Sequence, residues 1–302
     1  MRLDDQRESS NIENQRGQIG MGMPGSGMGL PIGGRTGGVG CGGIILLIII
    51  ASVLGLNPLS LIGMGEVDAP APVPPQAQVR PGVPAPRGPA IQNDTDRFVA
   101  KVLATTEDTW GKVFAASGQQ YPAPKLVLYD GVGRSGCGVA QSAAGPFYCP
   151  ADQKIYLDTS FFNEMARRFG APGDFAAAYV IAHEVGHHIQ LITGVAEQVQ
   201  RAQQRASKAQ GNALQVRMEL QADCYAGVWG HDHRQLLEPG DVEEALRAAS
   251  AIGDDTLMKQ AGRRPVPESF THGTSEQRMR WFMRGYQTGD PAQCDTFGAA
   301  QL

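Results

Sequence analysis

The hydrophobic residues of this 302-residue chain follow a different pattern in each of its parts. Residues 1–40 are rich in glycine, methionine and serine and have no apolar periodicity, which predicts a disordered tail. Residues 41–61 include the continuous apolar run from Ile44 to Leu54, and no charge lies between Gly37 and Leu56. About 20 uncharged residues suffice to cross the ~30 Å hydrocarbon core of a bilayer. We therefore expect one transmembrane helix at 41–61, with a buried core helix as the alternative.

A proline-rich stretch separates this apolar run from the rest of the chain. Residues 62–94 carry eight prolines with alanine and valine between them, which is typical of an extended polyproline II linker. Residues 95–302 are enough for one folded domain. In that domain the apolar spacing predicts a helix over 95–116, strands over 125–129 and 154–157, and then only helices. A small N-terminal sheet followed by helices is an α+β arrangement.

The strongest chemical signal is the motif HEVGH at His183–His187, which lies in a predicted helix. Asp174 is the candidate N-cap of this helix, Gly194 is its candidate stop, and apolar residues recur on the face away from the histidines. Histidines four residues apart share one helix face, so both imidazoles can bind a single Zn²⁺ ion. Glu184 can then act as the general base for a metal-bound water, as in zinc peptidases.

Residues beyond the motif indicate which class of zinc site to expect. Gln190 and Thr193 stand where a metzincin has glycine and histidine, which excludes that class. A gluzincin takes its third ligand from a glutamate on a later helix, and Glu219, in a helix predicted from about Asn212, is our candidate. Asp223, one turn further on, can hold the free ring N–H of a ligating histidine.

Other histidines offer alternatives. His231 and His233 are rival third ligands, although they follow Gly230 at a predicted helix end, which fixes no direction for them. His188 points about 100° around the helix from His187 and is interpreted as a flanking residue.

A downstream histidine is a further candidate for catalysis. His272 lies in a loop before a helix predicted over 276–286. Gluzincins commonly supply such a donor to stabilise the oxyanion of the reaction, so His272 is our second catalytic candidate. The alternative is that His272 and Arg278 only tie the loop to the domain.

Four cysteines follow the apolar run, an even set that suits an oxidising compartment. Cys137 and Cys149 flank a hairpin-like segment and are predicted to pair, which leaves Cys224 for Cys294. The alternative is four reduced cysteines in a cytosolic domain. Cys41 lies at the predicted membrane boundary.

Charge bears on topology and on partners. Four arginines precede the apolar run, and no lysine or arginine follows it until Arg80, which favours a cytoplasmic N-terminus. A net charge of −4 and a pI near 5.9 argue against a nucleic-acid partner. Aromatic residues at 110, 161–162 and 281–282 are predicted to be core and not a substrate subsite.

Taken with its flanking motifs, the chain resembles the neutral zinc metallopeptidases of bacteria, the YpfJ-like family, over essentially its full length. The residues that carry the resemblance are Met1 to Glu13, Arg16-Gly17, Cys149 to Asp152, His183 to His188, Glu219 to Gly227 and His272 to Arg278. The resemblance implies a zincin-like domain anchored in the bacterial plasma membrane, with peptidase activity and one zinc ion.

We therefore expect a single-pass membrane peptidase of the gluzincin type, with its catalytic domain outside the cytoplasm and a peptide or protein as substrate. His183, His187 and Glu219 are the expected metal ligands, and Glu184 the expected base. Residues 138–143 are the candidate edge strand for binding substrate by β-augmentation. The rival hypothesis is a zinc-stabilised membrane adaptor that binds partners and cleaves nothing.

Overall fold

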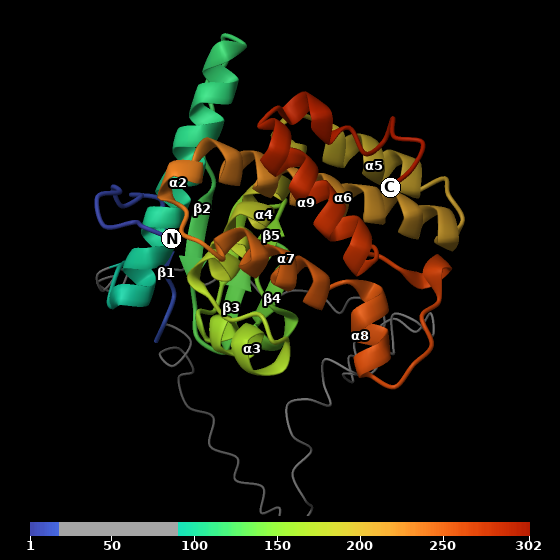
Figure 1. Cartoon of the computed structure of the whole chain (residues 1–302), viewed down its shortest axis with the longest axis horizontal. Helices are drawn as coiled ribbons and strands as arrows, with labels where there is room; N and C mark the ends of the chain where they lie inside the picture. Colours follow the sequence, from blue (N-terminus) through green and yellow to red (C-terminus); the bar gives the residue numbers. More distant parts are fainter. Residues whose placement is uncertain (18–89) are drawn as a thin grey trace, which may run out of the picture. The chain divides into compact units, whose positions relative to one another are not determined.

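The computed structural model of the chain describes residues 1–17 and 90–302 (Figure 1). The predicted transmembrane helix at 41–61, Cys41 and all but the last residues of the predicted linker at 62–94 lie outside the described residues. Within 1–17 and 90–302, no helix combines the length and the apolar character needed to cross a bilayer.

A four-stranded sheet with the order β1-β2-β6-β5 lies beside the helices. Its strands are β1 (Ile12–Asn14), β2 (Lys125–Leu128), β6 (Lys154–Leu157) and β5 (Phe147–Cys149). The first three run parallel, and β5 pairs antiparallel with β6 at the edge. Strands β3 (Val132–Ser135) and β4 (Gly138–Gln141) form a separate hairpin. The small sheet and the helices after it confirm the predicted α+β class.

Residues 1–17 are folded onto the domain, so the prediction of a disordered tail over 1–40 was wrong for this part. Ile12 pairs with Leu126 in the sheet, and Met1, Leu3 and Ile12 are buried. Arg16 donates two hydrogen bonds of 2.8 Å to the buried carboxylate of Asp96. Composition suggested disorder because few large apolar residues occur here, whereas main-chain pairing and ion pairs supply the order.

The amino group of Met1 lies among carboxylates at the start of α4. It donates to Asp174 Oδ1 and Oδ2 at 2.8 and 2.7 Å, and lies 3.2 Å from both Glu238 Oε2 and Asp241 Oδ2. Burial lowers the pKa of this amino group, but Asp174 and Asp241 raise it above its ordinary value. Asp174 is therefore not the N-cap that we predicted; Gly173 holds that position.

Helices make up most of the remaining structure. The α-helices of the described residues are α2 (Asp94–Ala116), α3 (Ser160–Arg168), α4 (Asp174–Ile192), α5 (Val195–Gln203), α6 (Lys208–Asp232), α7 (Asp241–Ala251), α8 (Asp254–Gln260) and α9 (Ser275–Thr288). Four short 3₁₀ turns are also present in the described residues: η3 (Ser142–Ala144), η4 (Arg234–Leu236), η5 (Pro267–Ser269) and η6 (Pro291–Cys294). The predicted helix over 95–116 and the strands near 125 and 154 are confirmed, each to within one residue.

Glycines allow α4, α6 and α9 to pack closely. A Cβ atom at Gly186 on α4 would lie 2.9 Å from the Cα atom of Ala222 on α6. At Gly285 on α9 it would lie 1.9 Å from the Cys224 carbonyl oxygen, again on α6. The backbones of α4 and α6, the two helices that carry the candidate site, therefore lie almost in contact. Few residues other than glycine fit at these crossings.

Two disulfides are present, Cys137–Cys149 and Cys224–Cys294, with the predicted pairing. The first closes the segment from the turn of the β3–β4 hairpin to the end of β5, which contains β4 and η3. The second joins α6 to η6. The aromatic side chains of Trp110, Trp281 and Phe282 are buried, whereas Phe161 and Phe162 are half-buried.

Candidate metal centre

Three predicted ligands come together where α4 crosses α6. His183 and His187 lie one turn apart on α4, and Glu219 faces them from α6. One ligand atom from each lies within 4.8 Å of the others. The close crossing at Gly186, between the two histidines, brings the helices near enough for this. Two imidazoles and a carboxylate form a donor set that suits zinc.

Hydrogen bonds at the far side of each ring select the nitrogen that faces the centre. His183 Nδ1 donates to Asp223 Oδ1 at 2.8 Å, and His187 Nδ1 donates to Gln190 Oε1 at 2.9 Å. Because those acceptors fix the Nδ1–H tautomer of each neutral ring, Nε2 is the nitrogen whose lone pair is left to bind a metal. The Nε2 atoms lie 3.3 and 3.7 Å from the two Glu219 oxygens. The three side chains therefore fit a divalent cation.

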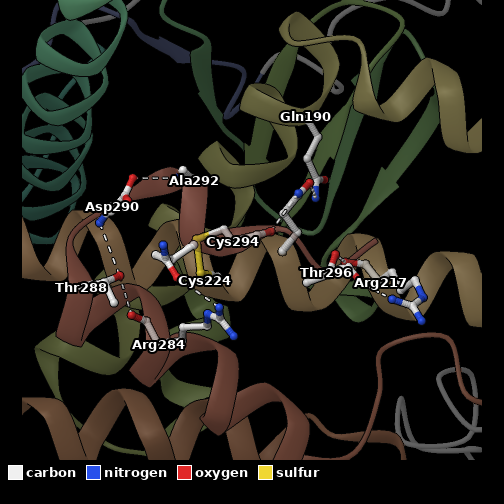
Figure 2. Close-up of a disulfide and its surroundings, with 11 residues drawn as sticks. Gln190, Arg217, Cys224, Arg284, Thr288, Asp290, Ala292, Cys294 and Thr296 are labelled. Atoms are coloured by element: carbon white, nitrogen blue, oxygen red, sulfur yellow. Dashed lines mark hydrogen bonds between the residues drawn. A yellow bond between two sulfur atoms is a disulfide. The ribbon is translucent and has the colours of Figure 1, made fainter. Parts of the chain in front are cut away.

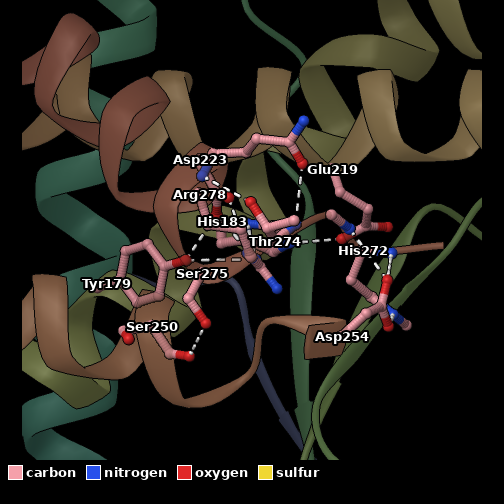
Figure 3. Close-up of polar contacts among 12 residues, drawn as sticks. Tyr179, His183, Glu219, Asp223, Ser250, Asp254, His272, Thr274, Ser275 and Arg278 are labelled. Carbon is pink, nitrogen blue, oxygen red and sulfur yellow. Dashed lines mark hydrogen bonds and ion pairs between the residues drawn. The ribbon is translucent and has the colours of Figure 1, made fainter. Parts of the chain in front are cut away.

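A buried charge network holds Asp223 in place behind His183 (Figure 3). Arg278 on α9 donates from Nε to Asp223 Oδ2 and from a terminal nitrogen to Oδ1, both at 2.8 Å. Tyr179 donates its hydroxyl to Oδ1 at 2.6 Å. Asp223 and Arg278 are almost fully buried. Such partners of a metal-binding histidine fix its orientation and raise its basicity.

The charges of the side chains in this centre favour the binding of a cation. Burial lowers the pKa of His183, but Asp223 and Glu219 raise it to about 9. Burial raises the pKa of Glu219, yet His187 and His183 hold it well below its ordinary value. Asp223 is likewise kept ionised against burial by Arg278 and His183, which lower its pKa. Glu219 also accepts a hydrogen bond of 3.0 Å from Gln215.

Glu184 lies beside the ligands without joining them. Its side chain is buried, and the backbone N–H of Tyr148 on β5 lies near its carboxylate and lowers its pKa. Burial has the largest effect on the pKa of Glu184 and raises it. His187 and His183 lower this pKa and Glu219 raises it, and the net shift is upward. A carboxylate in these surroundings can both take up and release a proton.

His272 lies near Glu219 (Figure 3). Its side chain is about half exposed, and its Nδ1 lies 3.3 Å from Asp254 Oδ1. Burial lowers the pKa of His272, but Asp254 and Glu219 raise it. Arg278 is buried behind Asp223, where its hydrogen bonds join α9 to α6.

The other candidate histidines lie elsewhere. His188 contacts the Tyr148 hydroxyl at 2.9 Å and the Pro122 carbonyl at 2.6 Å. His231 bonds the Tyr286 carbonyl, and His233 bonds the Thr105 carbonyl. None of these three imidazoles joins the cluster of ligands.

The candidate edge strand also differs from the prediction. Most of residues 138–143 belong to β4, in the separate hairpin. The edge of the main sheet nearest the centre is β5, since the backbone of Tyr148 reaches Glu184. Sequence reasoning missed β5 because a three-residue strand carries almost no periodic signal.

The fold and the site together define an α+β protein with a candidate metal centre made of a histidine pair and a glutamate. The chain belongs to the family described as "Putative neutral zinc metallopeptidase", whose model matches residues 1–297. It is 50% identical over 301 residues to the protein YpfJ of Escherichia coli K12, covering 99% of each chain. It is 45% identical over 222 residues to the protein Rv2575 of Mycobacterium tuberculosis H37Rv, covering 69% of this chain and 74% of that protein. No solved structure matches this chain.

Proposed function

We propose that this chain is a zinc-dependent peptidase of the gluzincin type. The observation that carries the proposal is the convergence of both Nε2 atoms on the Glu219 carboxylate, with the separate carboxylate of Glu184 beside them. His183, His187 and Glu219 would hold one Zn²⁺ ion, which when bound polarises a carbonyl and acidifies a water.

Glu184 is the proposed general base and proton shuttle. It would take the proton from the attacking water at its carboxylate and deliver it to the leaving amine. The backbone N–H of Tyr148 lies near this carboxylate and favours its ionised form. A purely structural metal site has no use for a buried carboxylate next to its ligands, and burying one without a role costs stability.

Substrate binding is proposed at the outer edge of β5. An extended peptide can add to a sheet edge through main-chain hydrogen bonds, and this edge reaches Glu184 through Tyr148. His272, half exposed and with a raised pKa, would donate to the oxygen that gains negative charge as the peptide bond is attacked.

Replacing Glu184 by glutamine tests the proposal. Glu184→Gln should lower peptide turnover by about 10²–10⁴-fold, because general base catalysis contributes that much, and it should leave bound zinc unchanged. Metal content by mass spectrometry and turnover of a peptide library by the full chain are the two measurements. Unchanged turnover would remove Glu184 from the mechanism, whereas zinc at unit stoichiometry with no cleavage by the parent chain would favour the adaptor hypothesis.

A further inference from the structure

The Cys224–Cys294 disulfide lies close to the metal centre along α6 (Figure 2). Cys224 follows Asp223 directly and lies five residues after Glu219. Cys294 ends η6, and both cysteines are fully buried. Two residues later, Thr296 donates its hydroxyl to the Arg217 carbonyl at 2.7 Å. The disulfide thus anchors a C-terminal segment against the turns of α6 that carry the third ligand.

Two glutamine side chains connect this segment to His187. Gln221 Nε2 donates to the Cys294 carbonyl oxygen at 3.0 Å. Gln190 Nε2 donates to Gln221 Oε1 at 3.2 Å and to the Met218 carbonyl at 2.7 Å. Gln190 Oε1 then accepts from His187 Nδ1 at 2.9 Å. The connection therefore runs from the disulfide to the ligating ring without a break.

The direction of each bond in this series is fixed by the one before it. The Cys294 carbonyl can only accept, so Gln221 must turn its NH₂ toward it and its oxygen toward Gln190. Gln190 must then present its NH₂ to Gln221 and its oxygen to His187. Both glutamines are buried, where an unmade hydrogen bond costs about 1–3 kcal/mol. Moving the Cys294 carbonyl would free the Gln221 amide to rotate, and Gln190 would lose its acceptor on Gln221 while keeping its bond to the Met218 carbonyl.

We propose that the Cys224–Cys294 disulfide positions His187 for metal binding, acting through the amides of Gln221 and Gln190. This inference rests on the proposed zinc centre. It makes Gln190 and Gln221 positioning residues and gives the disulfide a role beyond cross-linking the fold.

The test compares the two disulfides of the full chain. Zn²⁺ affinity is measured by competition with a chromophoric chelator, and ligand geometry by the visible absorption of Co²⁺. Cys224→Ser/Cys294→Ser should weaken Zn²⁺ binding by about 10–100-fold, the usual loss when a partner of a ligating histidine is removed. The matched control, Cys137→Ser/Cys149→Ser, should keep the parent affinity, because among the described residues no hydrogen-bonded glutamine series leads from that disulfide to a ligand ring.

Gln221→Met keeps the disulfide and removes only the hydrogen bonds that connect the Cys294 carbonyl to Gln190. This variant therefore tests the inference even if the cysteine variant fails to fold. It should lower Zn²⁺ affinity about 10-fold and alter the Co²⁺ spectrum. Parent affinity and spectrum in Gln221→Met would refute the inference while leaving the zinc centre intact. Absence of metal binding by the parent chain would instead refute the proposed zinc centre.

A second, independent inference concerns topology. The chain leaves the described domain at residue 17 and returns at residue 90, and these two ends meet. Asn14 Nδ2 donates to the Ala90 carbonyl at 3.3 Å, and Asp96 accepts from both Arg16 and the Gln92 N–H. Parallel pairing of β1 with β2 also requires both parts in one place.

A single bilayer crossing at 41–61 would put residues 1–17 and 90–302 on opposite faces of the membrane. We infer that both lie on the same side of any membrane that the chain meets. The single-pass expectation and its cytoplasmic N-terminus are incompatible with this domain if its core lies outside the cytoplasm.

Cysteine labelling distinguishes the two arrangements in the full chain. In a Cys41→Ala background, Asp5→Cys and Gln120→Cys each place a thiol at an exposed position. A membrane-impermeant maleimide should label both in intact spheroplasts, or both only after lysis. Labelling of one position in intact spheroplasts and of the other only after lysis would show a single crossing and overturn the inference.

Discussion

The carboxylate of Asp223 accepts hydrogen bonds from side chains on two other helices. His183 and Tyr179 come from α4, and Arg278 comes from α9. A buried ion pair of this kind adds little net stability when complete, but an unpaired buried charge is costly. We therefore expect this network to fix the position of α9 relative to the metal centre.

Arg278→Met should destabilise the protein by about 3–5 kcal/mol, because Asp223 would keep a buried charge without its partner. Adding Asp223→Asn should recover part of that loss, since no charge then remains. Urea unfolding in the presence of a chelator measures both effects. Arg280→Met on the same helix is the control: its exposed pair with Glu276 is worth at most ~0.5 kcal/mol. Equal losses in the two single variants would contradict this account.

Spacing along the chain could predict only part of this site. His183, His187, Glu219 and Asp223 share helix faces at intervals of four residues, so helical geometry placed them correctly. Gln190, three residues after His187, was available to the same reasoning. Arg278 was not, because it lies 55 residues beyond Asp223 along the chain and reaches it only through the packing of α9 on α6.

At the scale of elements, α6 and α9 approach each other as closely as backbones allow. A Cβ atom at Gly285 would meet the Cys224 carbonyl, and one at Gly227 would lie 2.1 Å from the Phe282 carbonyl oxygen. Neither obstacle is a flexible side chain. The helices would have to separate to accept any substitution here.

Gly285→Ala should therefore destabilise the protein by at least about 1–3 kcal/mol, the cost of overpacking a core. Gly285→Ala should also weaken zinc binding, because the part of α6 that would have to move at Cys224 also carries Asp223, which holds His183. Gly111→Ala on α2 is the control: nothing lies within 4 Å of the added Cβ, and replacing a helical glycine with alanine should stabilise by about 0.4–1 kcal/mol. Thermal unfolding and chelator competition measure the two effects, and similar midpoints for both variants would refute the prediction.

His233, where α6 ends, makes stability depend on pH. Its Nε2 lies 2.9 Å from the Thr105 carbonyl, and within the described residues its buried Nδ1 has no hydrogen-bond partner. Burial has the largest effect on the pKa of His233 and lowers it. The Thr105 carbonyl, Asp232 and Asp108 raise this pKa and Lys112 lowers it, and the net shift is downward. The folded protein therefore takes up this proton less readily than the unfolded chain does.

Because the folded pKa lies below the unfolded value of about 6.5, stability from this group is complete above that pH and falls as the pH drops through it. His233→Gln should remove this dependence. The measurement is the difference in unfolding free energy between the parent and His233→Gln from pH 7.5 to pH 5. A difference that stays constant over this range would show that His233 does not contribute.

Helix boundaries show where sequence signals were strong and where they were overlooked. Ser207 and Gln210 form a capping box that starts α6 at Lys208, about four residues before the predicted start. The pattern Ser-x-x-Gln was present in the sequence. Thr274 and Gln277 form a second capping box before α9, which begins one residue before its prediction.

At the scale of the whole molecule, the N-terminal segment completes the sheet. It supplies β1, buries Met1, Leu3 and Ile12, and pairs Arg16 with the fully buried Asp96. No local pattern predicts this arrangement, because β1 is three residues long and pairs with a strand more than 100 residues later. The composition of residues 1–40 led us to predict a disordered tail, whereas residues 1–17 add a strand and apolar side chains to an existing core.

Deleting residues 1–17 should therefore destabilise the rest of the chain. The deletion leaves Asp96 buried without Arg16, which by itself costs about 3–5 kcal/mol, and exposes the edge of β2. Unfolding of the full chain and of residues 18–302 by urea, followed by circular dichroism, measures the loss. A disordered tail would give equal midpoints.

A synthetic peptide of residues 1–17 should restore the lost stability in proportion to the logarithm of its concentration, as expected for a ligand that binds only the folded state. The same peptide with Arg16→Met should restore less, because it cannot pair with Asp96. Equal rescue by both peptides would show that strand pairing and apolar contacts hold the segment without the ion pair. If neither peptide restores the stability of a destabilised deletion variant, the covalent connection through residue 17 is required. A strand that the chain holds at high local concentration can bind where a free peptide cannot.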